Sequence, residues 1–378
     1  MAADVLASSC AVTVYDQGKA IGRKFLVAGQ GGFNLTNRVE GEELLAHYAP
    51  TGFLDEALEA FPPTALRNWL HDMGIDTYVG TSGRVFPVKG IKPIDVLEAI
   101  RRRLLDRGVE FALEHRFIGF DAEQRPVLAH GEQHVIPQAD HYLFALGGAS
   151  WPVTGSTGSW TEAVEGIGIA LVPFAPSNCG VHVPWPDSFR SAHAGKALKN
   201  IRVNAGDREF LGEATITEHG LEGNAIYPIV PALREAFTES REAILHIDLK
   251  PNNTTDELLQ KLRSIEPPAY AKALNFGRPE LALIKAFTTK AEFLDTQRFT
   301  ERIKDLQLPV TGLRPIDEAI STAGGISTKA LDPHFRSVQH PHLSFIGEMV
   351  DWDAPTGGFL LQGCFAMGHH AAGVLLDR

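Results

Sequence analysis

The chain has 378 residues, of which 44% are hydrophobic and 21% charged, and this is enough for two or three domains with cores of their own. Its formal net charge of −11 argues against DNA or RNA as a partner, because phosphate backbones are bound by basic surfaces. No apolar run of roughly 18 residues stands out, so no membrane partner is expected, and three dispersed cysteines favour a cytoplasmic location. The oligomeric state stays open.

The first segments indicate a nucleotide-binding sheet whose opening is missing. Residues 2–7 predict a short helix, and residues 11–15 predict a strand of β-branched side chains that ends at Asp16. In dinucleotide-binding units an acidic residue at this place binds ribose hydroxyls, about 20 residues after the first glycine of a Gly-x-Gly-x-x-Gly turn. Counting back about 20 residues from Asp16 places that turn before Met1. We expect either a start site assigned too late or a true truncation.

A true truncation would have structural consequences. The first strand is central in such a sheet, so its loss is expected to expose edges on the strands at residues 11–15 and 343–346. We expect such a chain to hold its cofactor poorly and to aggregate.

Residues 28–37 are too glycine-rich and too polar for a core element. Their glycines would let backbone N–H groups approach a ligand, and their side chains would supply hydrogen bonds; these residues are Gly29, Gly31, Gly32, Asn34, Thr36 and Asn37. An ordinary loop is the alternative interpretation.

The middle of the chain predicts several elements in order. Residues 93–107 predict a helix whose residues 101–103, all arginine, form a solvated face. Four short segments predict a small antiparallel sheet: 109–113, 117–121, 126–129 and 133–137. Residues 141–146 predict a buried strand that ends at Gly147 and Gly148.

The pattern then changes twice. Residues 172–249 contain short alternating segments broken by Gly and Pro, as in a barrel or sandwich, and residues 254–306 are mostly helical. A strand at residues 343–346 leads to Gly347 and Glu348, and a loop ending in Gly357 and Gly358 leads to a helix at residues 359–376. This order delivers a carboxylate and a helix N-terminus to a ligand at the carboxyl ends of the strands.

The order of elements predicts an α/β fold in which an inserted module lies inside a split nucleotide-binding domain. The predicted parts are residues 1–171, the insertion 172–322 with a helical subdomain at about 254–306, and residues 323–378.

Several motifs occur in an order that resembles one family. They are Gly22-Arg-Lys24, Gly31-Gly-Phe-Asn-Leu-Thr-Asn37, Gly83-Arg-Val-Phe-Pro87, Leu146-Gly-Gly-Ala-Ser150, His219-Gly-Leu-Glu-Gly223, Thr322-Ala-Gly-Gly325 and the terminal Gly347-Glu348 with Thr356-Gly-Gly358. Together they resemble the aminoacetone-oxidase-like or BaiN-like FAD-dependent oxidoreductases over essentially the whole chain.

The resemblance implies a Rossmann-like FAD-binding domain split in sequence, with an inserted β-barrel and a small helical domain. It also implies FAD as cofactor and a set of residues that bind it. Asp16 would bind the adenosine ribose, Glu348 would face the ribityl or pyrophosphate region, and Gly357 and Gly358 would lie at the pyrimidine edge of the flavin. The other implied cofactor-binding residues are Arg23, Lys24, Gly31, Gly32, Asn34, Leu35, Thr36, Gly147, Gly148, Gly347 and Leu361. No metal is implied, and NAD(P)H is a transient co-substrate in this interpretation.

Candidate catalytic residues are few. His219, which precedes a glycine turn in the insertion, is the best acid–base candidate, and Glu222 beside it could favour a cationic substrate. Adjacent helical residues point about 100° apart, so His369 and His370 are interpreted as packing or surface residues and not as a chelating pair. Four tryptophans are candidates for cofactor stacking or for core packing: Trp151, Trp160, Trp185 and Trp352.

The predicted function is that of an FAD-dependent oxidoreductase acting on an unknown small molecule, with NAD(P)H or oxygen completing the cycle. Reduction of an activated carbon–carbon double bond and oxidation of a small amine both stay open. A catalytically silent FAD- or ligand-binding remnant is the alternative.

Overall fold

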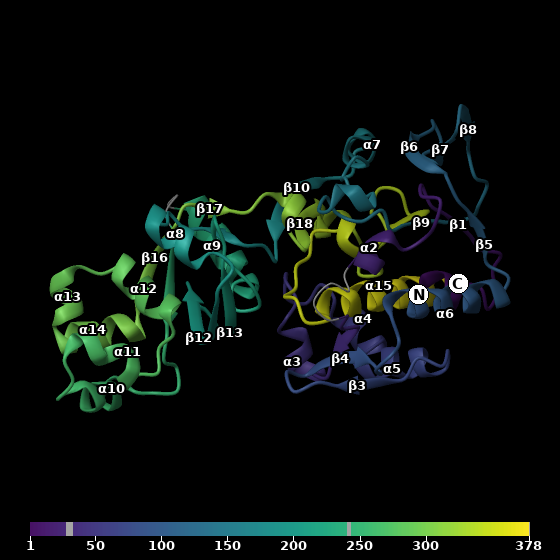
Figure 1. Cartoon of the computed structure of the whole chain (residues 1–378). Helices are drawn as coiled ribbons and strands as arrows, with labels where there is room; N and C mark the ends of the chain where they lie inside the picture. Colours follow the sequence, from purple (N-terminus) through teal and green to yellow (C-terminus); the bar gives the residue numbers. More distant parts are fainter. Residues whose placement is uncertain (28–32, 240–242, 378) are drawn as a thin grey trace. The chain divides into compact units, whose positions relative to one another are not determined.

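The computed structural model describes residues 1–27, 33–239 and 243–377 and divides into two compact units (Figure 1). Residues 1–175 and 321–378 form one, called here the split unit, and residues 176–320 form the other, called the inserted unit. The boundaries predicted from sequence lie a few residues from these.

Two parallel strand pairs form the framework of the split unit. Strand β1 (Thr13–Tyr15) pairs with β5 (Glu110–Ala112), and β9 (Tyr142–Phe144) pairs with β19 (Leu343–Phe345). The second pair joins segments about 200 residues apart in sequence, as a domain split by an insertion requires. Because β5 belongs to a parallel pair, its predicted place in the small antiparallel sheet was wrong.

Strand β19 is hydrogen-bonded on both edges. One edge pairs with β9. On the other edge, the Phe345 N–H donates to the Phe335 carbonyl at 2.9 Å, and Ser344 forms an antiparallel β-bridge with Arg336. The expectation of an exposed edge on residues 343–346 was therefore wrong.

Two small antiparallel sheets and a set of short helices complete the split unit. The sheets are β2 (Thr36–Asn37), β4 (Arg84–Pro87) and β3 (Thr77–Val79), and β6 (Arg116–Phe120), β7 (Pro126–His130) and β8 (Gln133–Val135). The short helices are α1 (Ala2–Leu6), α2 (Arg23–Val27), α3 (Gly41–Leu45), α4 (Asp55–Ala60), α5 (Pro63–His71) and α7 (Thr161–Gly166).

Helix α6 (Pro93–Asp106) forms where the sequence predicts it. Pro93 occupies its first turn and the Asp95 carboxylate accepts a hydrogen bond from the Lys92 N–H at 2.7 Å, which together fix the start of the helix. The arginine face is not wholly solvated, because Arg103 Nε donates to the buried carboxylate of Asp4 at 2.8 Å. The third arginine therefore anchors α1 to α6.

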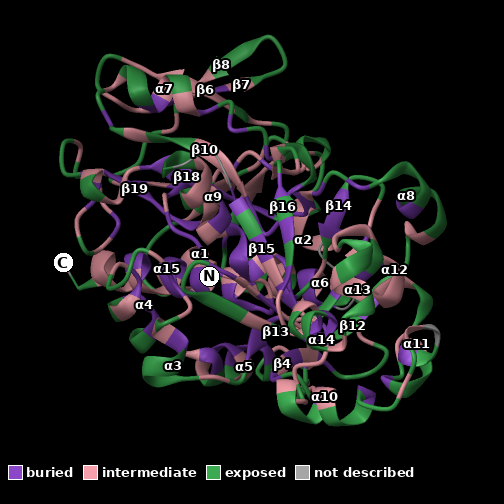
Figure 2. Cartoon of the chain, turned by 90° about the vertical axis from the view of Figure 1, so that its left-hand side faces the viewer, coloured by how far each residue is buried: buried purple, intermediate pink, exposed green. Residues whose placement is uncertain are grey.

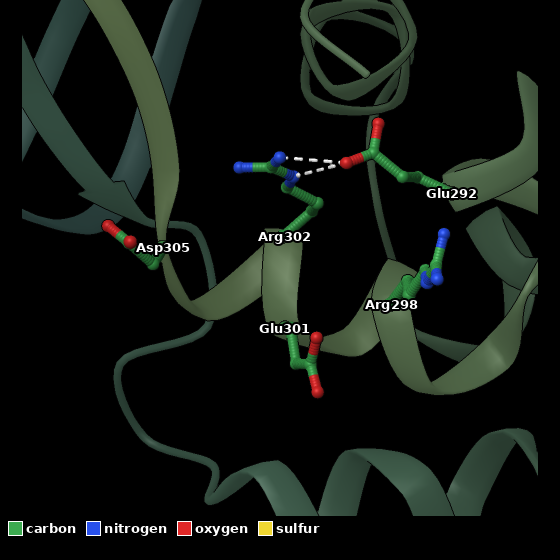
Figure 3. A pocket seen from close by; sticks show the side chains of 5 residues that line it. All are labelled: Glu292, Arg298, Glu301, Arg302 and Asp305. Atoms are coloured by element: carbon green, nitrogen blue, oxygen red, sulfur yellow. Dashed lines mark hydrogen bonds and ion pairs between the residues drawn. The ribbon is translucent and has the colours of Figure 1, made fainter. Parts of the chain in front are cut away.

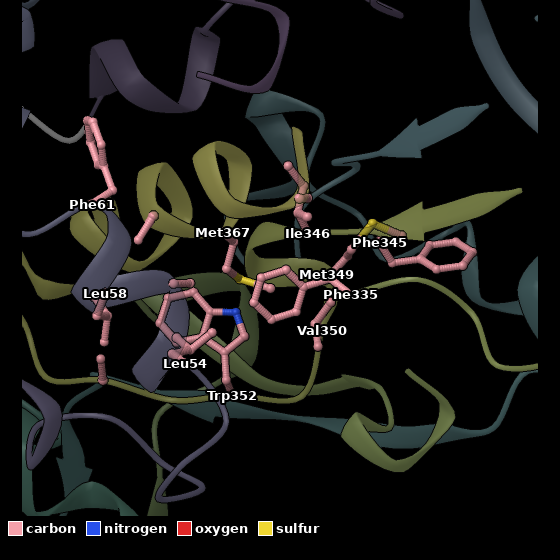
Figure 4. Packing of buried hydrophobic residues seen from close by; sticks show 14 of the residues in the cluster. Leu54, Leu58, Phe61, Phe335, Phe345, Ile346, Met349, Val350, Trp352 and Met367 are labelled. Carbon is pink, nitrogen blue, oxygen red and sulfur yellow. The ribbon is translucent and has the colours of Figure 1, made fainter. Parts of the chain in front are cut away.

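Helix α15 (Phe359–Leu376) is the longest element of the split unit and packs in its core (Figure 4). By length and composition alone it could cross a membrane, contrary to the expectation from sequence. Its buried residues Ala366, Met367 and Ala371 belong to the same apolar cluster as Leu54 of the α4 N-cap and Trp352. A core helix of a globular domain can have the same length and apolar composition, and α15 packs as such a core helix does.

The inserted unit is built on one antiparallel sheet of seven strands in the order β16-β15-β12-β13-β14-β11-β17. The strands are β11 (Val181–His182), β12 (Ala197–Ala205), β13 (Arg208–Ile216), β14 (Gly220–Glu222), β15 (Ala243–Asp248), β16 (Leu306–Val310) and β17 (Gly312–Leu313). Buried and exposed residues alternate along β16, which gives the sheet one apolar face (Figure 2).

The predicted barrel is not closed by hydrogen bonds, since no pairing among the described residues joins β16 to β17. Only Thr311 separates these two edge strands in sequence, so one continuous segment forms both edges of the sheet. The sheet must therefore curl until its two edges approach each other. The helices of the inserted unit are α8 (Asp187–His193), α9 (Val230–Glu239), α10 (Thr255–Leu262), α11 (Tyr270–Ala273), α12 (Arg278–Ala286), α13 (Lys290–Leu294) and α14 (Thr296–Lys304).

The chain passes between the units along two neighbouring strands, β10 (Leu171–Ser177) and β18 (Ser321–Ile326). The Ser327 N–H donates to the Ala170 carbonyl at 2.9 Å, and the Ile320 N–H donates to the Asn178 carbonyl at 3.2 Å. The two crossings are therefore antiparallel neighbours.

Candidate functional site

Two glycines end the parallel strands β9 and β19 in the same way. Gly147 and Gly347 have φ angles of +78° and +74°, which favour glycine. The indole of Trp160 donates to the Gly147 carbonyl at 2.9 Å, and that of Trp352 donates to the Gly347 carbonyl at 2.8 Å. Both indoles are buried, so these tryptophans support the turns from within the core.

An ion pair lies directly beyond these turns. Lys24 Nζ is 2.8 Å from Glu348 Oε2 and donates to Ser150 Oγ at 2.9 Å. The other carboxylate oxygen, Oε1, accepts a hydrogen bond from the Thr322 N–H at 3.1 Å. Lys24 and Glu348 were predicted as cofactor-binding residues, and the structure brings them together. Ser150 and Thr322 were not predicted, although both lie inside motifs noted in the sequence.

Gly148 leaves room for this cluster. A Cβ atom at Gly148 would overlap Thr322 Oγ1 and would lie 3.1 Å from both Cγ and Cδ of Glu348. The backbone of the strand end therefore passes against the carboxylate, and any larger residue would displace it.

The thiol of Cys364, a half-buried residue of α15, lies beside the same carboxylate. Burial, followed by the negative charge of Glu348, raises the pKa of Cys364 to about 12. The thiol is therefore protonated at neutral pH and is no nucleophile.

The N-terminus of α15 forms the second part of the site. Gly357 and Gly358 have φ angles of +113° and +100°, and the backbone of Gly358 lies so close to Thr36 that a Cβ atom would overlap its carbonyl group. Asn37 Nδ2 donates to the Gly357 carbonyl at 3.1 Å, and Thr36 Oγ1 donates to Gln362 Oε1 at 2.8 Å. The residues 36–37 thus fix the glycine turn in place.

Gly358, the N-cap residue of this helix, has no side chain with which to cap it, and the first turn contains no acidic residue. Its first N–H groups are donors that lack partners inside the helix. They can stabilise a negative charge by roughly 0.3–2 kcal/mol.

The other predicted cofactor-binding residues have varied environments. Asp16 Oδ1 accepts a hydrogen bond from the Gly18 N–H at 2.6 Å, and Arg23 Nη2 donates to the Val153 carbonyl at 3.0 Å. Leu35 is a core residue and offers a ligand only its backbone, whereas Asn34 and Leu361 are half-buried. Gly31 and Gly32 lie outside the described residues. Their cofactor roles stay predictions.

His219 belongs to the inserted unit. It lies exposed between β13 and β14, with its ring centroid 5.8 Å from that of His182. Glu222, at the end of β14, is also exposed. The predicted catalytic role of His219 and the predicted substrate preference of Glu222 remain untested.

A charged cavity of about 370 Å³ lies among the helices of the inserted unit (Figure 3). Two of its lining residues form an ion pair, in which Arg302 Nη2 lies 2.7 Å from Glu292 Oε1. Its other lining residues are Arg298, Glu301 and Asp305. None of the five was a predicted site residue.

Comparison with known proteins places this geometry in context. A family profile described as "HI0933-like protein Rossmann domain" matches residues 1–374. A ribosomal RNA dihydrouridine synthase of Haemophilus influenzae is 25% identical, covering 96% of this chain and 91% of the relative. A 3-dehydro-bile acid delta(4,6)-reductase of Clostridium scindens is 22% identical, covering 97% of this chain and 93% of the relative.

Among solved structures, a variant of the E. coli quinol fumarate reductase chain FrdA matches with a TM-score of 0.49 and 14% identity, covering 100% of this chain and 68% of that one.

Proposed function

The chain belongs to the HI0933-like family of Rossmann-type FAD-dependent oxidoreductases, and from this premise we propose that it reduces a carbon–carbon double bond conjugated to a carbonyl group. The names of two relatives support the reaction class. A 3-dehydro-bile acid delta(4,6)-reductase and a dihydrouridine synthase both saturate a double bond of this kind. Oxidation of a small amine, which the sequence leaves open, has no such support.

The residues of the split unit fit FAD. A fixed carboxylate, Glu348, lies next to the end of β19, and the N-terminus of α15 follows the turn at Gly357 and Gly358. A carboxylate accepts hydrogen bonds from sugar or ribityl hydroxyls, and the N–H groups of a helix N-terminus suit the anionic edge of a flavin. When bound, FAD supplies the group that accepts and donates hydride.

Each residue of the site then has a separate task. Lys24 and the Thr322 N–H hold the two carboxylate oxygens of Glu348, so this side chain faces a ligand in one orientation. Trp160 and Trp352 hold the carbonyls of Gly147 and Gly347 and so fix the strand ends. Such preorganisation lowers the entropy lost when the ligand binds.

The observation that carries the proposal is the ion pair of Lys24 and Glu348 beside the glycine turns that end β9 and β19. The electron donor we propose is NAD(P)H, with a small conjugated carbonyl compound as acceptor and the cytoplasm as location. His219 remains our candidate for the proton donor.

An RNA base is a second candidate substrate, because the relatives from Haemophilus influenzae and Escherichia coli, 25% and 24% identical, are named as ribosomal RNA enzymes. The net charge of −11 opposes it, since RNA binding depends on basic surfaces. A uridine-containing RNA transcript therefore belongs in the same assay.

The test is an anaerobic reduction and reoxidation experiment on the full chain with added FAD. We expect bound flavin that NADH or NADPH bleaches and that 2-cyclohexenone or a 3-keto-4-ene steroid reoxidises. A chain that binds no FAD, or whose flavin no nicotinamide reduces, would favour the catalytically silent alternative. If the reduced flavin is reoxidised only by oxygen or only by RNA, and not by the conjugated carbonyl compounds, these compounds are rejected as substrates.

The Glu348→Gln variant tests the site itself. It keeps the size of the side chain but removes the charge that faces Lys24, so we expect weaker FAD binding. Glu59→Gln, an exposed glutamate of α4, is the matched control and should bind FAD as the wild type does.

A further inference from the structure

Two histidines far apart in sequence meet at one side of α15. His334 Nδ1 lies 3.1 Å from His370 Nε2, and both residues are half-buried. Glu56 Oε2 lies 3.9 Å from the same His370 nitrogen, and its side chain is 68% exposed. All three ligand atoms lie within 4.8 Å of one another.

The geometry points to a divalent-metal site, and we propose that Glu56, His334 and His370 bind Zn²⁺. Zinc–nitrogen bonds of about 2.0–2.1 Å in a tetrahedral site place two ligand nitrogens roughly 3.3 Å apart. The two imidazole nitrogens already lie near that separation. The carboxylate is farther away, but an exposed glutamate on the first turn of α4 can rotate inward at little cost.

His370 has the second hydrogen bond that metal-binding histidines usually have. The backbone of Pro333, which has a carbonyl but no N–H to offer, lies near its ring. Because Nε2 faces His334, Nδ1 is the nitrogen that is free to donate to this carbonyl. Nε2 then carries the lone pair, as a metal ligand requires.

His334 is held by a rigid turn. The Asp332 carboxylate accepts hydrogen bonds from the His334 N–H at 2.9 Å and from the Arg336 N–H at 3.0 Å. The Asp332 N–H in turn donates to the Arg336 carbonyl at 2.8 Å. The His334 ring is therefore presented from a fixed backbone, which reduces the entropy cost of binding an ion.

The three ligands come from three separate elements: α4, the turn at residues 332–336 and α15. A bound ion would tie these elements together and would keep a fourth position for water, because Glu56 lies at the surface. The adjacent His369 takes no part, since its ring stacks on Phe61 with centroids 4.8 Å apart.

A direct hydrogen bond between the two histidines is the competing explanation, and zinc titration separates the two. Isothermal titration of the full chain with ZnCl₂ should show one ion per chain. His334→Gln should weaken binding by about 100-fold and Glu56→Gln by about tenfold, because they remove a principal and a peripheral ligand respectively. The temperature of unfolding should rise with zinc only where binding persists.

His130→Gln is the matched control. His130 is exposed, and its ring stacks on that of His115 with centroids 4.3 Å apart. The substitution therefore removes one histidine of a different pair in the split unit. The control should bind zinc as the wild type does, and all variants should unfold at similar temperatures in EDTA. Absence of one-to-one binding by the wild type, or equal affinity in His334→Gln, would overturn the proposal.

Discussion

Replacement of Gly148 by alanine should disturb the candidate site through one added methyl group. This Cβ atom would overlap Thr322 Oγ1 and lie 3.1 Å from two carbon atoms of Glu348, so the carboxylate or the strand end must move. Such overpacking costs about 1–3 kcal/mol. If the cost falls on the bound state, FAD affinity should fall by about 5- to 150-fold, measured by fluorescence titration of FAD into the apoprotein.

The double variant Gly148→Ala/Thr322→Ala tests the cause. It removes the overlapping hydroxyl but keeps the Thr322 backbone N–H that binds Glu348, so affinity should partly recover. We expect a coupling energy of about 0.5–3 kcal/mol between the two positions. Gly373→Ala is the control, because its added Cβ would meet nothing within 4 Å beyond the backbone of its own helix, and alanine favours a helix. Unchanged affinity in Gly148→Ala, or no recovery in the double variant, would refute the reasoning.

Three further predictions follow from described contacts. Asp4→Asn should lower the free energy of unfolding by about 3–5 kcal/mol at neutral pH, because Arg103 loses its buried partner. Burial alone would raise the pKa of Asp4, but the hydrogen bonds that its carboxylate accepts, led by that from Arg103, outweigh burial and lower the pKa overall. The contribution of Asp4 to the free energy of unfolding is therefore complete above about pH 4 and is lost in stronger acid. Urea unfolding at several pH values checks this, and a difference from wild type that persists in acid would contradict it. Alkylation of the folded chain near pH 8, read by peptide mass spectrometry, should label exposed Cys10 and spare Cys364, whose pKa burial raises to about 12. Lys24→Met should weaken FAD binding about tenfold in the same titration, whereas equal affinity would remove Lys24 from the site.

Motifs on single segments could be predicted from the sequence. The glycines after β9 and β19 and the pair at residues 357–358 were expected at strand and helix ends, and the structure places them there with left-handed φ angles at all except Gly148. Such positions can be recognised from the local sequence, because few residues other than glycine adopt this backbone conformation. Lys24 and Glu348 lie in recognisable motifs, although their mutual contact does not follow from either one.

Contacts between distant segments could not be predicted. The hydrogen bond of Lys24 to Ser150 and that of Thr322 to Glu348 depend on how the strands are ordered, which no local pattern states. His370 was considered only with its helix neighbour, because its partner His334 is brought in by a separate turn. The strand at residues 110–112 was assigned to the wrong sheet for the same reason.

The two antiparallel crossings at β10 and β18 make the insertion a removable cassette. Ala175 and Ser321 lie on adjacent strands, so a short artificial turn between them would bypass residues 176–320 and leave the rest of the chain continuous. Evolution can therefore exchange the inserted unit as a whole while the split unit is inherited unchanged.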